Sequence, residues 1–264
     1  MVFPPFSAIV SQGPKTGVKY IYYLLKYRFS AWWTQLGIRW GSATSFFPPK
    51  FRFDPGKSRT PGLARDMHAQ MNTYLAEGNL ERLSQICTHA LQEKFKAVVN
   101  KRKKSDATKG RDNSVLRWEV LRYEGRPKIV FSSTFPFPKT PALPKSLKPP
   151  LLFESVVRIK SVQRLARWKP TTKEAATRSP SVDPTGWEIV SGTEKVHDAS
   201  ENVVIQRQFD PNTYMPLDGW KFWGTIGHTQ WADIKQILDL ESMEREKADQ
   251  SVAKTIEDMG LGKK

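Results

Sequence analysis

Residues 153–168, FESVVRIKSVQRLARW, constrain the fold more than any other part of the chain. Their side chains alternate at period two, so that one face is mostly apolar and the other carries Arg158, Lys160 and Arg164. This alternation is typical of an antiparallel strand with one buried face, and a strand of this length must bend or curl. The outer cations form either a solvated sheet face or a rigid basic stripe that meets an anionic partner.

Two helices are expected before the strands. Thr60 and Pro61 are a cap and first-turn signal, and Gly78 is a C-terminal stop. Asn79 then caps a second helix, and Cys87 lies on the apolar face of that helix, where we expect a core residue rather than a nucleophile. The second helix ends in a basic run that includes Lys101, Arg102, Lys103 and Lys104.

Period-two segments predict the other strands, at residues 114–124, 128–137, 187–196, 202–209 and 220–228. The first two are expected to form a hairpin through the turn at 125–127. The proline-rich segment 136–150 is expected to be a stiff, extended loop. The insertions at 171–185 and 211–219 are assigned no role.

The order of these elements predicts an α+β domain over residues 60–230, with two N-terminal helices packed on one face of a curved antiparallel sheet. This order matches the cone-shaped fold of the nuclear-transport-factor-two-like proteins. Residues 1–59 are expected to form an extended N-terminal arm and linker. Residues 231–264 are expected to form a helical extension that leaves the core.

The chain carries a formal net charge of +16. An excess of this size favours a polyanionic partner, either nucleic acid or an anionic membrane surface. Besides the cations named above, the candidate residues in the arm are Lys19, Lys26, Arg28 and Arg39.

The arm contains no acidic residue before Asp54 and is dense in Tyr and Trp. An acid-free basic terminus has the composition of a mitochondrial targeting segment. The same residue types also suit an interfacial membrane anchor or an arm that stacks on RNA. No apolar run reaches the roughly 20 residues that a membrane span needs, so a peripheral association is favoured, and the three alternatives stay open.

Four segments carry a family resemblance: AEGNLERLSQICTHAL at 76–91, VVRIKSVQRLA at 156–166, NVVIQRQF at 202–209 and GWKFWGTI at 219–226. They resemble a family that unites a large-subunit protein of the mitochondrial ribosome, its membrane-associated ribosome receptor in fungi, and the subunit that anchors the import motor at the inner-membrane presequence translocase. The resemblance covers about residues 60–230. Within the family, the chain is most similar to the ribosomal branch, because a motor anchor should carry a long charged, coiled N-terminal region and this chain has a short, acid-free aromatic arm instead.

The resemblance implies a component of the mitochondrial large ribosomal subunit near the polypeptide exit site, on the matrix side and peripheral at the inner membrane. Its partners would be the large-subunit rRNA, neighbouring ribosomal proteins, membrane lipid and the insertion machinery. The alternatives are a motor-anchor subunit of the translocase and, from another class, a cone-fold enzyme that acts on a small molecule.

Catalysis is not expected. A cone-fold enzyme needs an acid–base residue inside the cone with a partner within hydrogen-bond reach, and the polar residues expected inside are Ser155, Ser161, Gln163 and His228. The four His residues show no metal-ligand spacing, and the pair His197–Asp198 is expected in a solvated loop. We therefore expect no cofactor, no metal and no small-molecule substrate.

Overall fold

The computed structural model describes residues 2–4, 8–9, 11, 13–45, 50–108, 114–137, 148–172, 185–240 and 242–243. The chain divides into two compact units, one made of Met1–Ser30 with His228–Lys264 and the other of Ala31–Gly227. The second unit is an α+β domain with a six-stranded antiparallel sheet among its described residues. This unit begins before the predicted residue 60, at Ala31, and ends at Gly227, close to the predicted residue 230.

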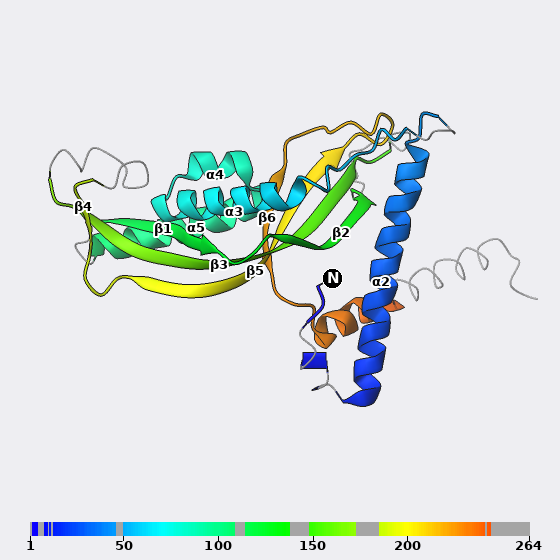
Figure 1. The fold of residues 1–264 in the computed structure, drawn as a ribbon, viewed down its shortest axis with the longest axis horizontal. Coiled ribbons are helices and arrows are strands. Elements are labelled where there is room, and N and C mark those ends of the chain that lie inside the picture. The colour runs from blue at the N-terminus through cyan, green and yellow to red at the C-terminus, as the bar shows by residue number, and fades with distance from the viewer. Residues whose placement is uncertain are drawn as a thin grey trace, which may run out of the picture. The chain divides into compact units, whose positions relative to one another are not determined.

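The sheet is built around β3 (Leu151–Pro170), which is long and curved (Figure 1). One edge of β3 pairs with β2 (Lys128–Pro136) and then with β1 (Val115–Tyr123). The other edge pairs with β5 (Lys195–Phe209) and, at its end, with β4 (Trp187–Ile189). Strand β6 (Lys221–Ile226) adds to the far side of β5.

The predicted hairpin is wrong. Strands β1 and β2 do not pair with each other but run in the same direction, end to end, along β3: Lys128–Pro136 opposes 151–158 and Val115–Tyr123 opposes 161–168. The backbone N–H of Glu124 also bonds to the Lys160 carbonyl oxygen at 2.8 Å. The 20-residue length of β3 provides room for both strands, so the segment with Gly125 (φ 79°) acts as an interruption rather than a reversal.

The strand predicted at 202–209 is present but longer, because β5 runs without a break from Lys195 to Phe209, whereas the strand predicted at 187–196 is reduced to β4, Trp187–Ile189. His197 and Asp198 have exposed side chains, and this pair was expected in a loop. Their backbone nonetheless pairs with β3, for example Gln163 with His197 and Val162 with Asp198. The pair His197–Asp198 is exposed as expected, but it lies in a strand.

The helices of the second unit are α3 (Thr60–Glu77), α4 (Leu80–Ile86) and α5 (His89–Thr108). Gly78 ends α3 in the left-handed region at φ 72°, and the Asn79 side chain accepts a hydrogen bond from the Arg82 N–H at 3.1 Å, as predicted. Thr60 is not the cap, because Arg59 holds that position and the Thr60 hydroxyl donates to the Gly56 carbonyl oxygen.

The expected second helix is two helices. The chain becomes extended at Cys87, which bridges to Phe222 of β6, and the Thr88 N–H donates to the Phe222 carbonyl oxygen at 3.0 Å. This pairing with β6 replaces helical hydrogen bonds between α4 and α5. Cys87 is buried in the core as expected, and α5 continues past the basic run to Thr108.

One face of the sheet forms the main core with the helices. Met67 and Met71 of α3 and Leu83 of α4 pack with Val157, Val203 and other apolar residues of β3, β5 and β6. Figure 1 shows α3, α4 and α5 on the same side of the sheet. A second cluster joins Phe53, Phe153 and Phe209, whose rings meet edge to face.

The arm is not extended as predicted. Residues Pro14–Gly41 form the 28-residue helix α2, whose first part belongs to the first unit and whose last part, from Ala31, belongs to the second. In the first unit, Tyr20 and Leu24 of α2 form a buried cluster with Ile234. Residues 231–240 are helical, and Trp231 meets the Tyr20 ring edge to face. The described part of the C-terminal extension, residues 231–240, therefore packs on the arm within the first unit.

Several expectations lie outside the described residues: most of the proline-rich loop (138–147), most of the insertion at 171–185 (173–184), and the chain beyond residue 243. The loop at 211–219 is described. The Asp210 carboxylate organises its first turn by accepting the N–H groups of Asn212 and Thr213 at 2.8 and 2.7 Å. These hydrogen bonds lower the pKa of the Asp210 carboxyl.

Candidate polyanion-binding surfaces and the buried polar network

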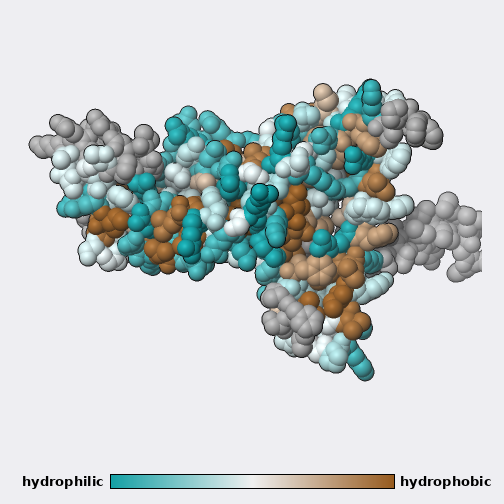
Figure 2. Space-filling model, in the orientation of Figure 1, coloured by the Kyte–Doolittle hydropathy of each residue, from teal (hydrophilic) through white to brown (hydrophobic). Residues whose placement is uncertain are grey.

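Helix α2 exposes apolar side chains along one side, which we call the aromatic stripe. At about 100° per residue, these side chains fall within an arc of about 100° on α2, those up to residue 30 in the first unit and those from residue 31 in the second. The stripe consists of Val18, Tyr22, Leu25, Phe29, Trp32, Trp33 and Trp40, each more than half exposed. Tyr20 and Leu24 lie on the opposite side of the helix and are buried. In Figure 2, brown atoms gather where the lower half of α2 and residues 231–240 overlap in the view, whereas the surface over α3 and α4 is mostly teal.

The four candidate cations of the arm flank the aromatic stripe. Helical spacing places Lys19 and Lys26 along one border and Arg28 and Arg39 along the other. Between residues that the structure describes, none of the four forms an ion pair.

Three of these cations lie over aromatic rings instead. Lys26 Nζ is 5.8 Å from the Tyr23 ring centroid, and the guanidinium carbons of Arg28 and Arg39 are 5.2 and 4.5 Å from the centroids of Phe3 and Phe51. Aromatic contacts orient a cation without neutralising its charge. These charges therefore remain available to an anionic partner.

Arg39 has a cationic neighbour that the sequence reasoning missed. Lys57 and Arg39 line the same pocket of about 410 Å³, together with Trp32, Phe51 and Phe53. Partial burial and the nearby Arg39 charge lower the pKa of Lys57, and Lys57 Nζ donates to Gln35 Oε1 at 2.7 Å. No sequence spacing relates residues 39 and 57, because the chain between them returns through the bridge from Ala43 to Phe51.

The basic run on α5 is only partly available for binding. Lys101, Lys103 and Lys104 are exposed, but Arg102 is half-buried. Arg102 Nη2 lies 3.1 Å from the position that a Cβ on Gly78 would occupy, so it packs on the corner between α3 and α4. Burial lowers the pKa of Arg102, and the nearby Asp106 opposes that effect. Arg102 is therefore a structural residue, and the three lysines are the candidates.

The outer face of β3 carries the predicted cations in the predicted alternation, but the protein already engages two of them. Arg164 forms ion pairs with Glu119 and Glu194, and Arg158 Nε donates to Asn202 Oδ1 at 3.2 Å. Lys160 alone of the three is exposed. These contacts favour the interpretation of this face as a solvated sheet face over that of a continuous basic stripe. An anionic partner would have to compete with Glu119 and Glu194 for Arg164.

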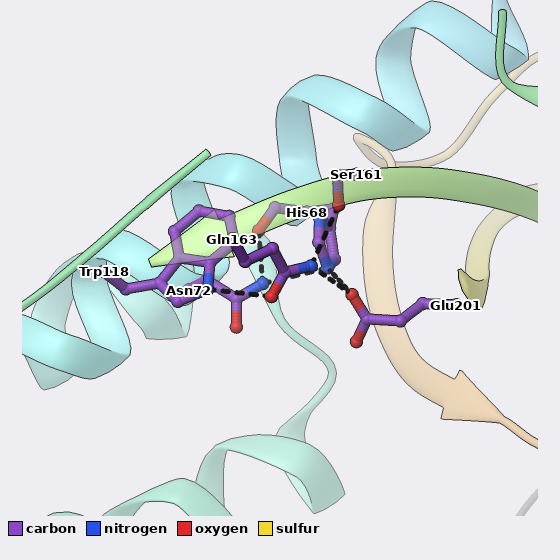
Figure 3. A network of polar contacts seen from close by, with 6 residues as sticks. All are labelled: His68, Asn72, Trp118, Ser161, Gln163 and Glu201. Carbon is purple, nitrogen blue, oxygen red and sulfur yellow. Dashed lines mark hydrogen bonds and ion pairs between the residues drawn. The ribbon is translucent and has the colours of Figure 1, made fainter. Parts of the chain in front are cut away.

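The opposite face of β3 carries a buried polar network centred on Gln163 (Figure 3). Gln163 Nε2 donates to Ser161 Oγ at 3.0 Å and to Glu201 Oε2 at 2.7 Å. Gln163 Oε1 accepts the indole N–H of Trp118 at 3.0 Å. The expectation that Ser161 and Gln163 lie inside is confirmed, and the two are bonded to each other.

The network also contains a histidine–carboxylate pair that the sequence reasoning missed. His68 of α3 is fully buried, and its Nε2 lies 2.9 Å from Glu201 Oε2. Asn72, one turn further along α3, places Nδ2 2.9 Å from the same nitrogen. His228, which was expected inside, is exposed and belongs to the first unit.

A sequence signal existed for His68 but not for Glu201. His68 lies four residues after Ala64 and one after Met67, so it falls on the buried face of the predicted helix. Glu201 lies just before a predicted strand, in the part of β5 that resembled a loop. In the structure, the hydrogen bond from His68 lowers the pKa of the Glu201 carboxyl, against the opposing effect of burial. The carboxylate is therefore held in its ionised form.

Across the described ranges, no helix is long and apolar enough to cross a membrane, and no group of three or more His, Cys, Asp or Glu side chains could hold a metal ion. The comparisons with known proteins find no matching family model and no matching curated protein.

Proposed function

We propose that this chain is a non-catalytic component of the mitochondrial large ribosomal subunit near the polypeptide exit site, where it binds rRNA and holds the subunit at the inner membrane during co-translational insertion. The family resemblance of residues 60–230 supports the ribosomal assignment. The helices α3, α4 and α5 before a curved antiparallel sheet also support the finer proposal of a nuclear-transport-factor-two-like cone. The protein would lie on the matrix side, peripheral to the membrane.

The observation that carries the membrane part of this proposal is the aromatic stripe of α2 with its flanking cations. A helix of this kind lies in the plane of a membrane interface, with its apolar side among the acyl chains and its cations near anionic headgroups. Trp and Tyr favour this depth, and each cation near the surface contributes about 1 kcal/mol. The arm has no acidic residue before Asp54, so no carboxylate within α2 opposes this binding by repulsion.

The ribosomal part of the proposal uses the exposed lysines of α5, Lys101, Lys103 and Lys104, with Lys160 on β3. Lysines that neutralise phosphates release counterions, which makes the association strongly dependent on salt. Neighbouring ribosomal proteins and the membrane insertion machinery would complete the partners. Co-sedimentation with the large subunit in a gradient of mitochondrial lysate would favour this proposal over the motor-anchor alternative, which expects the protein in the translocase fraction.

The membrane proposal is tested by flotation with cardiolipin-containing liposomes. The variant replaces Val18, Tyr22 and Leu25 by Ser, which removes three exposed stripe residues. If each side chain contributes about 1 kcal/mol on partial burial, the partition coefficient should fall about a hundredfold. The matched control replaces three similarly exposed apolar residues of the second unit, Val196, Met215 and Leu217, by Ser and should float like the unaltered protein.

The same variant separates the alternatives for the arm. If flotation is unchanged and binding to rRNA is weakened, the arm is an RNA-binding arm and not a membrane anchor. Unchanged binding in both assays would leave the import-signal interpretation of the arm. In either case the membrane-anchor proposal fails.

The enzyme alternative gains one specific observation, the buried pair of His68 and Glu201. A carboxylate with a histidine partner is the kind of acid–base group that this alternative needs. However, the His68 imidazole is fully buried, whereas the Glu201 side chain is 32% exposed. We propose that this group binds rather than catalyses.

A further inference from the structure

A pocket of about 490 Å³ opens beside Glu201 in the second unit. Helices α3 and α5 and strand β6 provide most of its walls. The lining is mainly apolar, with Met71, Leu75, Leu91 and Phe95 on the helices and Trp223 on β6. Trp223 is 46% exposed, so solvent reaches this wall.

Glu201 is the carboxylate among the residues that line the pocket, and the buried network holds it in one orientation. Both hydrogen bonds from the network end on Oε2, one from Gln163 and one from His68. Gln163 is fixed in turn by Trp118 and Ser161. In Figure 3 the second oxygen of Glu201 points away from these partners.

The second oxygen, Oε1, receives no hydrogen bond from any residue within the described part of the chain. A carboxylate has lone pairs on both oxygens, and Glu201 stays ionised because His68 stabilises the charged form. The pocket thus presents a fixed, half-buried negative charge beside an apolar wall. Lys94, exposed at the pocket lining, does not pair with it.

We propose that this pocket binds a small organic cation, an ammonium group attached to an apolar body. The ammonium would donate to Glu201 Oε1 in a charge-assisted hydrogen bond, and the apolar body would cover Leu75, Phe95 and Trp223. An anion would be repelled by Glu201, and a neutral alcohol would form a weaker bond to it. This site is independent of the proposed attachment to rRNA and membrane, which uses none of these residues.

The test measures binding of phenethylamine, a primary ammonium on a phenyl ring, to the full chain by calorimetry. Glu201→Gln keeps the shape of the side chain and removes its charge, and it should weaken binding at least about tenfold. Glu93→Gln makes the same charge change on the exposed side of α5, outside the lining, and should leave binding unchanged. Lys94→Ala should strengthen binding, because it removes a like charge.

A second comparison needs no variant and so does not depend on the folding of Glu201→Gln. The unaltered protein should bind 2-phenylethanol, the neutral analogue, at least about tenfold more weakly than phenethylamine. No measurable binding of phenethylamine, or equal binding of amine and alcohol, would overturn the proposal. Equal affinity in a folded Glu201→Gln variant, checked by circular dichroism, would do the same.

Discussion

The replacement Gln163→Leu tests whether the buried network stabilises the fold. Gln163 is 4% exposed and makes three hydrogen bonds, to Ser161, Glu201 and Trp118. Leu would fill a similar volume but would leave the indole N–H of Trp118 without its acceptor. Trp118 is only 8% exposed, so water cannot easily replace that acceptor. An unsatisfied buried donor costs about 1–3 kcal/mol.

The other two bonds add less. The Ser161 hydroxyl can rotate towards another acceptor, and Glu201 keeps His68 and partial access to water. We therefore expect the free energy of unfolding to fall by about 2–4 kcal/mol, measured by urea denaturation. The matched control is Gln206→Leu, because Gln206 is a half-buried glutamine of β5. This replacement should change the free energy of unfolding by no more than about 0.5 kcal/mol.

A double-mutant cycle identifies the cause. Trp118→Phe removes the donor that Gln163→Leu leaves unsatisfied. It should therefore cost less in a chain that already carries Gln163→Leu than in the unaltered chain, by about 1 kcal/mol or more. Additive losses would show that the stability change comes from altered packing. A loss below about 0.5 kcal/mol for Gln163→Leu would refute the argument that the network stabilises the fold.

Three further predictions concern charge and burial. Replacing Lys101, Lys103 and Lys104 by Ala while keeping Arg102 should reduce the dependence of log affinity for a large-subunit rRNA fragment on log salt by about 2, with little change in stability; an unchanged slope would exclude phosphate contacts by these lysines. Burial raises the pKa of the Cys87 thiol to about 11, although Lys221 opposes it, so a thiol reagent should modify Cys87 only on unfolding; fast modification of the native protein would contradict its core position. Because the pKa of Glu201 is lowered in the fold, its contribution to stability is present above the ordinary value of 4.5 and is lost as the pH falls through the folded pKa. In urea titrations, the free energy of unfolding should therefore fall less on acidification in Glu201→Gln than in the unaltered chain. Equal losses of free energy would show that another group dominates.

Local signals in the sequence predicted local structure well. Gly78 and Asn79 set the corner between α3 and α4 through their own backbone and side-chain preferences, which neighbouring residues do not override. The alternation in β3 likewise placed Ser161 and Gln163 inside the fold. These features need only the residue types and the period of a strand or helix.

The features that could not be predicted depend on pairing between distant segments. Whether β1 pairs with β2 or continues along β3 is decided by the length of β3. The exposed side chains of His197 and Asp198 do not reveal that their backbone joins the sheet. Helix α2 was missed because apolar residues occur on both of its sides, one packed and one exposed. Composition identified the candidate cations, but only the structure shows that Glu119 and Glu194 already pair with Arg164.

The two kinds of charged group in this protein should respond differently to substitution. The exposed cations of α2 and α5 contribute little to stability, because water solvates them equally well in the unfolded chain. Their replacement should therefore change binding alone. Glu201 is tied to His68 and Gln163, so its replacement should change both stability and the proposed cation binding. Loss of polyanion binding without loss of stability, together with a joint loss at Glu201, is the pattern expected if the surface and the pocket are separate sites.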